Sequence, residues 1–347
     1  MGLRKTIFAL SLVAFAALSG CSTKVDLYAD YKQVPVIYGL LDAKADTNYI
    51  KITRAFYPQG DAYQVALNPD SSNYPGRLDV RLVEYRNNDS IGELILDTIT
   101  IHNKETGTFY APEQKLYYTA EKLKTNTSKS SYSYRLKVAL PDRNLSTKAK
   151  MVGCSSFGVQ SLGVNFSKQY IGKPPLPFLF HPAINAKFYQ VSMAFTFLEQ
   201  RTPDSDSVPR TMAWDIGTWM DYELSDGQED SYVFRYSPSI FYEKLAEFIG
   251  ADTSIVGMKR FITDYPVEVT ISAGGENLRH YIYTNNDAYG FVGNETEFSL
   301  IDGARGVFSS RSTTRARVRL AGETVPDLVS ITKYRFVFIG GKDATDE

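Results

Sequence analysis

Cysteine is scarce in this chain of 347 residues, which has only Cys21 and Cys154. Two cysteines allow at most one intrachain disulfide, and none if Cys21 carries another covalent group. The chain therefore lacks the disulfide framework of small secreted domains and must be stabilised by hydrophobic cores. For Cys154 we expect a buried, unreactive thiol, and an intermolecular disulfide is the alternative.

An excess of either charge is also missing. The 38 Lys and Arg residues nearly balance the 39 Asp and Glu residues, which leaves a formal net charge of −1. Proteins that bind nucleic acid need a basic patch or stripe to neutralise phosphates, and the sequence shows none. We therefore expect no nucleic-acid partner.

Recognisable catalytic and metal-binding motifs are absent from the sequence. The three histidines, His102, His181 and His280, lie in different segments, each without a second ligand at metal-binding spacing. Neither H-E-x-x-H, G-x-S-x-G, a P-loop nor G-x-G-x-x-G occurs. We expect a non-enzymatic protein without catalytic residues, metal or cofactor. A hydrolase whose site is assembled from distant residues is the enzymatic alternative.

The densest acidic cluster runs from Asp221 to Asp230. An EF-hand calcium loop that begins at Asp221 would need glycine at its sixth position and glutamate at its twelfth. The chain has Asp226 and Tyr232 there. We favour a solvent-exposed hairpin tip at Asp226-Gly227 between strands at 214–222 and 231–236, with a calcium site as the alternative.

Long hydrophobic runs are lacking, and the apolar run Ile7–Ala17 is too short to span a bilayer. It follows the basic pair Arg4-Lys5 and precedes Leu18-Ser19-Gly20-Cys21, an order typical of a bacterial lipoprotein signal peptide. We therefore expect residues 1–20 to be removed and Cys21 to become lipidated.

The lipid on Cys21 predicts attachment to a membrane. Each buried CH₂ of an acyl chain contributes about 0.8 kcal/mol, so two or three chains anchor a protein almost permanently. Ser22 follows the cysteine, and no aspartate comes directly after it. We expect residues 21–33 to form a tether to the outer membrane, with the cell surface favoured over the periplasmic face.

What the chain does contain is a pattern of alternating apolar residues. Between residues 34 and 151 this pattern predicts a β-sandwich of the immunoglobulin or fibronectin type, in which Tyr132 or Tyr134 forms a tyrosine corner. The polar segment Asp61–Gly76 predicts a long surface loop, either a tolerated insertion or a binding loop. The expected strands lie at 36–38, 49–53, 78–82, 93–96, 98–101 and 132–140.

A second β-rich domain is expected over residues 152–347. Its clearest strand is 187–197, and others are expected at 267–271, 280–283, 315–320 and 334–339. One helix is predicted at 239–249, because Ser237-Pro238 is a favourable start and Gly250 a favourable end. Its buried stripe would contain Phe241, Leu245 and Phe248.

Aromatic residues are plentiful, with 24 tyrosines and 20 phenylalanines. Most of them fall on the alternating strands, which favours packing in cores over display at the surface. A platform that stacks glycans or peptides is the alternative.

Four short motifs give the chain a resemblance to uncharacterised outer-membrane lipoproteins of Bacteroidota. After the lipobox come Val36–Asp42 and the Tyr-x-Tyr-x-Leu-x-Val strand at 132–138. Asn185–Val191 resembles the N-A-K-x-Y-Q segment of that family, and Gly303–Arg311 resembles its N-G-x-G-x-F-S-S-R signature, with Asp302 in place of the asparagine. The resemblance implies association with large outer-membrane β-barrel systems, without catalytic residues to carry over.

The signature segment supplies the candidate site residues besides Cys21. Gly303 and Gly306 suggest a tight turn or a close backbone approach, and Phe308 suggests packing behind it. Arg311 is a candidate interface anchor. Our first hypothesis is an accessory or scaffold subunit of an envelope complex for barrel assembly, secretion or TonB-dependent transport. The second is a surface lipoprotein that captures glycans or peptides as nutrients.

Overall fold

The computed structural model describes residues 34–55, 61–157, 163–224, 231–250, 257–285 and 300–339. The predicted signal peptide, Cys21 and the tether lie outside these residues. Strands account for 49% of the structure and helices for 17%, so the fold class is mainly β, as the alternating patterns predict. Within the described residues, no helix has the length and apolar character needed to cross a membrane.

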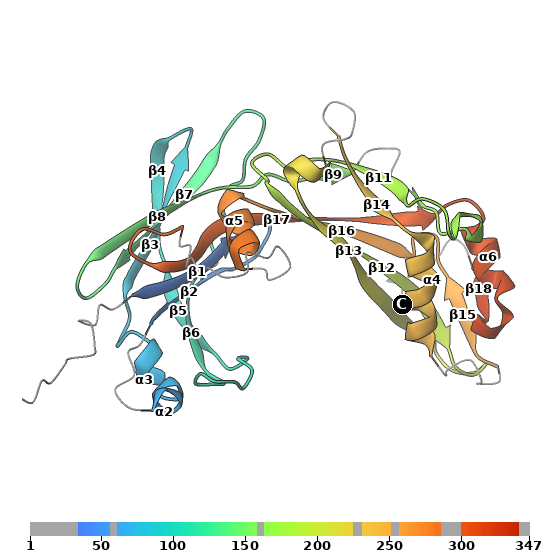
Figure 1. The fold of residues 1–347 in the computed structure, drawn as a ribbon, viewed down its shortest axis with the longest axis horizontal. Helices are drawn as coiled ribbons and strands as arrows, with labels where there is room; N and C mark the ends of the chain where they lie inside the picture. Colours follow the sequence, from blue (N-terminus) through green and yellow to red (C-terminus); the bar gives the residue numbers. More distant parts are fainter. Residues whose placement is uncertain are drawn as a thin grey trace, which may run out of the picture. The chain divides into compact units, whose positions relative to one another are not determined.

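The N-terminal region consists of two antiparallel sheets whose strand orders are β1-β2-β6-β5 and β4-β3-β7-β8 (Figure 1). Read in chain order, these are the ABED and C′CFG sheets of an immunoglobulin-like domain, which confirms the predicted sandwich. Their bounds are β1 (Pro35–Leu41), β2 (Asn48–Arg54), β3 (Asp79–Arg86), β4 (Asp89–Ile95), β5 (Asp97–Ile101), β6 (Gln114–Thr119), β7 (Tyr132–Ala139) and β8 (Asn144–Lys150).

The sandwich core forms because alternate side chains of both sheets point inward. Ile37 and Ile50 of one sheet and Leu82 and Leu136 of the other are fully buried in the same cluster. Near the start of β7, the Tyr134 hydroxyl accepts a 2.9 Å hydrogen bond from the Lys124 backbone N–H. This bond to the segment before the strand confirms the predicted tyrosine corner.

The longest strand, β17 (Arg305–Leu320), belongs to both regions of the chain. Its first part pairs in parallel with β1, from Val36 opposite Arg305 to Leu41 opposite Ser310. Its second part pairs antiparallel with β16 (Val267–Gly274). The boundary predicted at 151/152 remains a prediction, but β17 joins the sheets on either side of it into one hydrogen-bonded sheet.

The C-terminal region is built around β12 (Phe188–Gln200), which pairs with β13 on one side and with β16 and β15 on the other. A small second sheet has the order β14-β11-β9. The remaining strands are β9 (Ser156–Phe157), β10 (Gly163–Val164), β11 (Leu176–His181), β13 (Val208–Met220), β14 (Tyr232–Tyr236), β15 (Lys259–Ile262) and β18 (Phe336–Phe338). The helical segments are α2 (Ala62–Ala66), α3 (Pro69–Ser72), η2 (Lys168–Tyr170), η3 (Asp221–Leu224), α4 (Pro238–Ile249), α5 (Glu276–Asn285), α6 (Thr324–Ser330) and η5 (Thr332–Tyr334).

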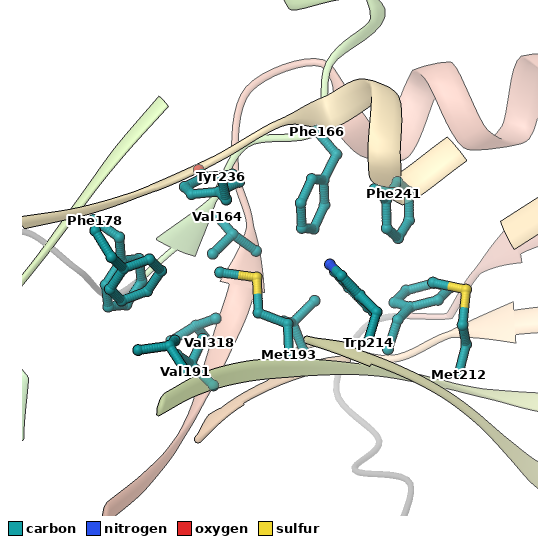
Figure 2. Close-up of a cluster of buried hydrophobic side chains, with 14 of the residues drawn as sticks. Val164, Phe166, Phe178, Val191, Met193, Met212, Trp214, Tyr236, Phe241 and Val318 are labelled. Carbon is teal, nitrogen blue, oxygen red and sulfur yellow. The ribbon is translucent and has the colours of Figure 1, made fainter. Parts of the chain in front are cut away.

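Aromatic side chains fill the core between the large sheet and α4 (Figure 2). The rings of Phe166 and Phe241 are stacked with centroids 4.2 Å apart, and Trp214 of β13 lies 5.9 Å from Phe241. Helix α4 confirms the predicted helix: Pro238 is at its start, Phe241 and Leu245 are fully buried, and Gly250 ends it with φ of 53°. Phe248 is half-buried against the same core.

Two predictions of local structure are wrong, because both segments contain helices. The expected loop Asp61–Gly76 contains α2 and α3, where the Asp61 and Asn68 carboxyl and amide oxygens accept backbone hydrogen bonds as N-caps. The expected strand at 280–283 is part of α5, where Glu276 contacts Arg279 and His280 at helical spacing.

The hairpin predicted around Asp226-Gly227 is also wrong. Strand β13 pairs with β12 along its length, and β14 pairs with β11 instead. The short connection of residues 201–207 makes β12 and β13 a local hairpin, which leaves no free edge of β13 for β14 on that side. Asp226 and Gly227 themselves lie outside the described residues.

Candidate interaction surface

The predicted signature segment forms the turn that leads into β17. An isolated bridge joins Ile301 to Ala304, and Gly303 between them has φ of 71°. Gly306 has φ of 101°, and a Cβ at this position would lie 2.1 Å from the Ile37 carbonyl oxygen. Gly306 therefore permits the close parallel approach of β17 to β1.

Phe308 is fully buried in the sandwich core rather than displayed to a partner. It lies opposite Gly39 of β1, where a Cβ would approach the Phe308 ring to 3.0 Å. Among Gly303, Gly306, Phe308 and Arg311, only Arg311 has a side chain that reaches solvent. The positive φ of the turn thus explains Gly303, packing explains Gly306 and Phe308, and Arg311 remains the candidate for interaction.

Arg311 is the first of four arginines on one side of β17 beyond its pairing with β1. Arg311, Arg315, Arg317 and Arg319 occupy alternating positions and are all exposed. Arg311 lies 3.6 Å from the Asp42 carboxylate, and Arg315 lies 3.6 Å from the Glu268 carboxylate.

These arginines border a face of the large sheet that carries mostly small polar side chains. The pairing register places Asp215, Ser192, Thr270 and Arg315 in one row across four strands. We call this surface the open face. It consists of Thr211, Ala213, Asp215 and Thr218 of β13, Gln190, Ser192, Ala194 and Thr196 of β12, Glu268, Thr270 and Ser272 of β16, and Arg311, Thr313, Arg315, Arg317 and Arg319 of β17.

The open face is the side of the sheet away from the aromatic core. Val191 and Met193 of β12 point into that core (Figure 2), and Phe195 of the same strand belongs to the same cluster. Helix α5 reaches one end of the outer side, where Leu278 packs near Gly274 and Phe188. From Gln190 to Thr196 the outward side chains are exposed or half-buried.

The open face also contains a hollow of about 210 Å³ beside Arg317. Thr196, Thr211 and Glu268 line it, and the Thr196 and Thr211 hydroxyls lie 2.9 Å apart. At the edge, the Arg319 guanidinium lies 4.8 Å from the centroid of the Tyr265 ring. Arginine, threonine and tyrosine side chains here offer hydrogen-bond donors.

The histidines do not converge on one site. His102 lies 3.7 Å from Glu113, His280 lies 2.7 Å from Glu276, and His181 is exposed on β11. Within the ranges that the structure describes, no group of three His, Cys, Asp or Glu side chains is placed to hold a metal ion.

The acidic cluster is partly used for structural contacts. The Lys187 ammonium lies 2.6 Å from the Asp221 carboxylate, and Glu223 accepts a 2.7 Å hydrogen bond from the Met220 backbone N–H. The ion pair raises the pKa of Lys187. Residues 225–230 lie outside the described part of the chain.

The prediction for Cys154 is wrong, because its side chain is exposed. It lies in the connection between β8 and β9, where Val152 and Ser155 point inward and are buried. The Ser312 hydroxyl is 3.6 Å from the Cys154 sulfur. The neighbouring residues Gly153 and Ser155 are buried in this short connection, and Cys154 between them faces outward.

No protein-family model matches the chain, and no curated protein matches its sequence.

The sequence analysis does not predict the open face, although the sequence contains one signal of it. Arg315, Arg317 and Arg319 alternate with Ala316 and Val318, a period-two pattern that places the arginines on one side of a strand. The residues that β12, β13 and β16 add to the open face can be identified only from the pairing register of the strands.

Proposed function

We propose that this protein is a non-enzymatic, lipid-anchored outer-membrane lipoprotein that acts as an accessory or scaffold subunit of an envelope protein complex. The complex would serve barrel assembly, secretion or TonB-dependent transport. The observation that carries the proposal is the open face with its four arginines. The lipobox at Cys21 and the resemblance to Bacteroidota lipoproteins support it.

The open face suits an acidic patch on another envelope protein. Arginine is enriched in protein interfaces and frequently contributes much of the binding energy, because its planar guanidinium makes several hydrogen bonds. The open face as defined has four arginines and two carboxylates, Asp215 and Glu268, so positive charges outnumber negative ones. Complementary charge on a partner would direct association and fix its orientation.

The position of the arginines on β17 adds a structural argument. A partner that binds Arg315 and Arg317 contacts β17, and the first part of this strand is hydrogen-bonded to β1 in the sandwich. The partner would thus be linked through a single strand to the region that follows the lipid tether. Such a connection is what a scaffold subunit requires.

Affinity purification from mildly solubilised membranes tests the proposal. We expect the wild-type protein to recover a stoichiometric envelope partner, and the variant Arg315→Glu/Arg317→Glu to recover at least tenfold less. The matched control is Lys122→Glu/Lys129→Glu, which makes the same charge change at exposed positions of the sandwich. Recovery of the wild-type protein alone would disprove the proposal.

The anchor is tested separately by Cys21→Ala. We expect the variant to remain as an unprocessed precursor or to leave the membrane fraction after carbonate washing. Unchanged retention would show that the amino terminus is not a lipoprotein signal.

A second function, capture of a small ligand at the cell surface, is favoured by one observation. The outer side of the β1-β2 pair bears a cavity of about 430 Å³ lined by cationic and aromatic side chains. Nutrient capture requires exposure to the medium, so protease treatment of whole cells should degrade the protein. Protection of the protein in intact cells would exclude this function.

A further inference from the structure

The cavity on the sandwich is formed by segments that are far apart in the sequence. Val36 and Tyr38 of β1 and Lys51 of β2 provide its floor, on the side of the sheet opposite the buried Ile37 and Ile50. The end of α3 and the segment 104–114 form its walls. Its volume of about 430 Å³ falls within the range of small-molecule sites.

Three cations line this cavity, and each is held by a neutral oxygen. The Lys51 ammonium donates to the Gln114 side-chain oxygen at 3.1 Å, and the Lys104 ammonium donates to the Tyr110 carbonyl oxygen at 2.5 Å. The Arg54 guanidinium donates to the Asp70 carbonyl oxygen at 2.8 Å. Within the described residues, none of the three is ion-paired with a carboxylate.

The cavity has an excess of positive charge, with three cations and one carboxylate in its lining. The Arg54 Nε atom is buried and has no hydrogen-bond partner among the described residues. Burial lowers the pKa of Lys51, and the charge of Lys104 lowers it further. The one lining carboxylate, Glu113, accepts from the Tyr110 hydroxyl at 3.2 Å and lies 3.7 Å from His102.

The rest of the lining combines aromatic side chains with the polar residues Thr53, Ser72 and Asn73. Phe109 is half exposed, with the Lys104 ammonium 5.7 Å from its ring centroid, and Tyr38 is also exposed. Flat rings beside this excess of positive charge favour a ligand that combines an anionic group with an apolar or aromatic body.

We propose that this cavity is a binding site for a small organic anion, whose carboxylate or phosphate oxygens contact Lys51, Arg54 and Lys104 and whose body packs against Tyr38 and Phe109. A carboxylate and a phosphate share the required acceptor geometry for lysine and arginine donors. The site lies on the sandwich and does not involve the open face, so it is independent of the proposed docking function. It specifies the ligand class for the second proposed function, and binding in solution tests it separately from exposure at the cell surface.

Calorimetric titration of the full-length, detergent-solubilised protein tests the site with four probes. Benzoate and phenyl phosphate carry the two anionic groups on one ring, benzyl alcohol is their neutral counterpart, and inorganic phosphate lacks the ring. We expect at least one of the two aromatic anions to bind at least tenfold more tightly than benzyl alcohol. The stronger of the two identifies the anionic group, and phenyl phosphate should bind more tightly than inorganic phosphate.

Substitutions locate the binding. Lys51→Gln/Lys104→Gln should weaken binding of the preferred anion at least tenfold, whereas Lys122→Gln, at an exposed ion pair with Asp46, should leave it unchanged. If the double variant does not fold, Arg54→Gln provides the same test. Equal affinity for benzyl alcohol, no binding of either aromatic anion at about 10 mM, or unchanged binding in the cavity variants would overturn the proposal.

Discussion

The two regions joined by β17 are stabilised by different kinds of core. The sandwich core is largely aliphatic, with Ile, Leu and Val from facing strands and few rings besides Tyr117 and Tyr134. The C-terminal core is rich in phenylalanine, with Trp214 and several tyrosines, and packs a sheet against α4 and the small β14-β11-β9 sheet.

The difference follows from what each core must fill. Two facing sheets with alternating inward residues leave a layer about 10 Å thick, which branched aliphatic side chains fill well. Between the large sheet and α4, rings such as Phe166, Phe195 and Phe241 fill the core in edge and stacked contacts. The sandwich core is thus filled mainly by branched aliphatic side chains, and the C-terminal core mainly by aromatic rings.

The largest expected effect is at the junction of the two regions. Gly306→Ala places a Cβ against the Ile37 carbonyl and imposes φ of 101° on an alanine, so β17 must move away from β1. We expect a loss of more than about 4 kcal/mol in the free energy of unfolding. Gly303→Ala, where no atom lies within 4 Å, should cost about 1 kcal/mol. Equal losses in urea unfolding would contradict the role of Gly306.

The second prediction concerns an ion pair inside the C-terminal region. Arg260 is fully buried and donates to Glu199 at 3.0 Å, and Arg210 also contacts Glu199 at 3.0 Å. Glu199→Gln removes the negative charge while the guanidinium stays buried, which should cost about 3–5 kcal/mol. Glu268→Gln, at a pair exposed on the open face, should cost less than about 1 kcal/mol. Thermal unfolding of both variants measures the contrast.

The third prediction is that the two cores unfold together. Leu245→Ala in α4 and Leu136→Ala in β7 each empty a fully buried site and should each cost about 3 kcal/mol. Both tryptophans of the chain, Trp214 and Trp219, lie in the C-terminal region and report on it alone. Because β17 is shared, Leu136→Ala should lower the midpoint seen by tryptophan fluorescence as much as that seen by circular dichroism. A fluorescence midpoint that stays at the wild-type value would show that the regions unfold independently.

A smaller effect is expected at the tyrosine corner. Tyr134→Phe removes the acceptor of the Lys124 N–H and should cost about 1 kcal/mol. Burial raises the pKa of Tyr134 to about 12, whereas an unfolded tyrosine titrates near 10. Its contribution is therefore complete below pH 10 and is lost as the pH rises through 12. Between pH 8 and pH 11 the wild type should lose more stability than Tyr134→Phe, and parallel losses would rule out this linkage.

The smallest effect on folding is expected at Arg311. Its side chain is about half exposed and its contact with Asp42 is long, so Arg311→Ala should change the free energy of unfolding by less than about 0.5 kcal/mol. If Arg311 takes part in the interface of the open face, partner recovery falls while the melting temperature is unchanged. Equal recovery from both proteins would restrict the interface to Arg315, Arg317 and Arg319.

The sequence predicted the sandwich well because its strands pair mainly with near neighbours and alternate cleanly, as at Tyr132–Leu140. It also predicted α4, since Pro238 and Gly250 mark its ends. It could not show that residues 305–310 return to pair with β1, because a contact over such a separation leaves no local pattern. The cavity was missed for the same reason: Lys51, Arg54 and Lys104 meet only after β2 and the segment 104–114 are folded.

The parallel pairing of β1 with β17 has a mechanical consequence. Tension on the predicted lipid tether would enter the fold at Pro35 and act along β1, toward its N-terminal end. A partner held on Arg315 and Arg317 would pull β17 toward its C-terminal end, in the opposite direction. The hydrogen bonds between the two strands, from Val36–Arg305 to Leu41–Ser310, are then loaded in shear and must break together rather than one after another. Membrane and partner would therefore be joined through the arrangement of paired strands that best resists being pulled apart.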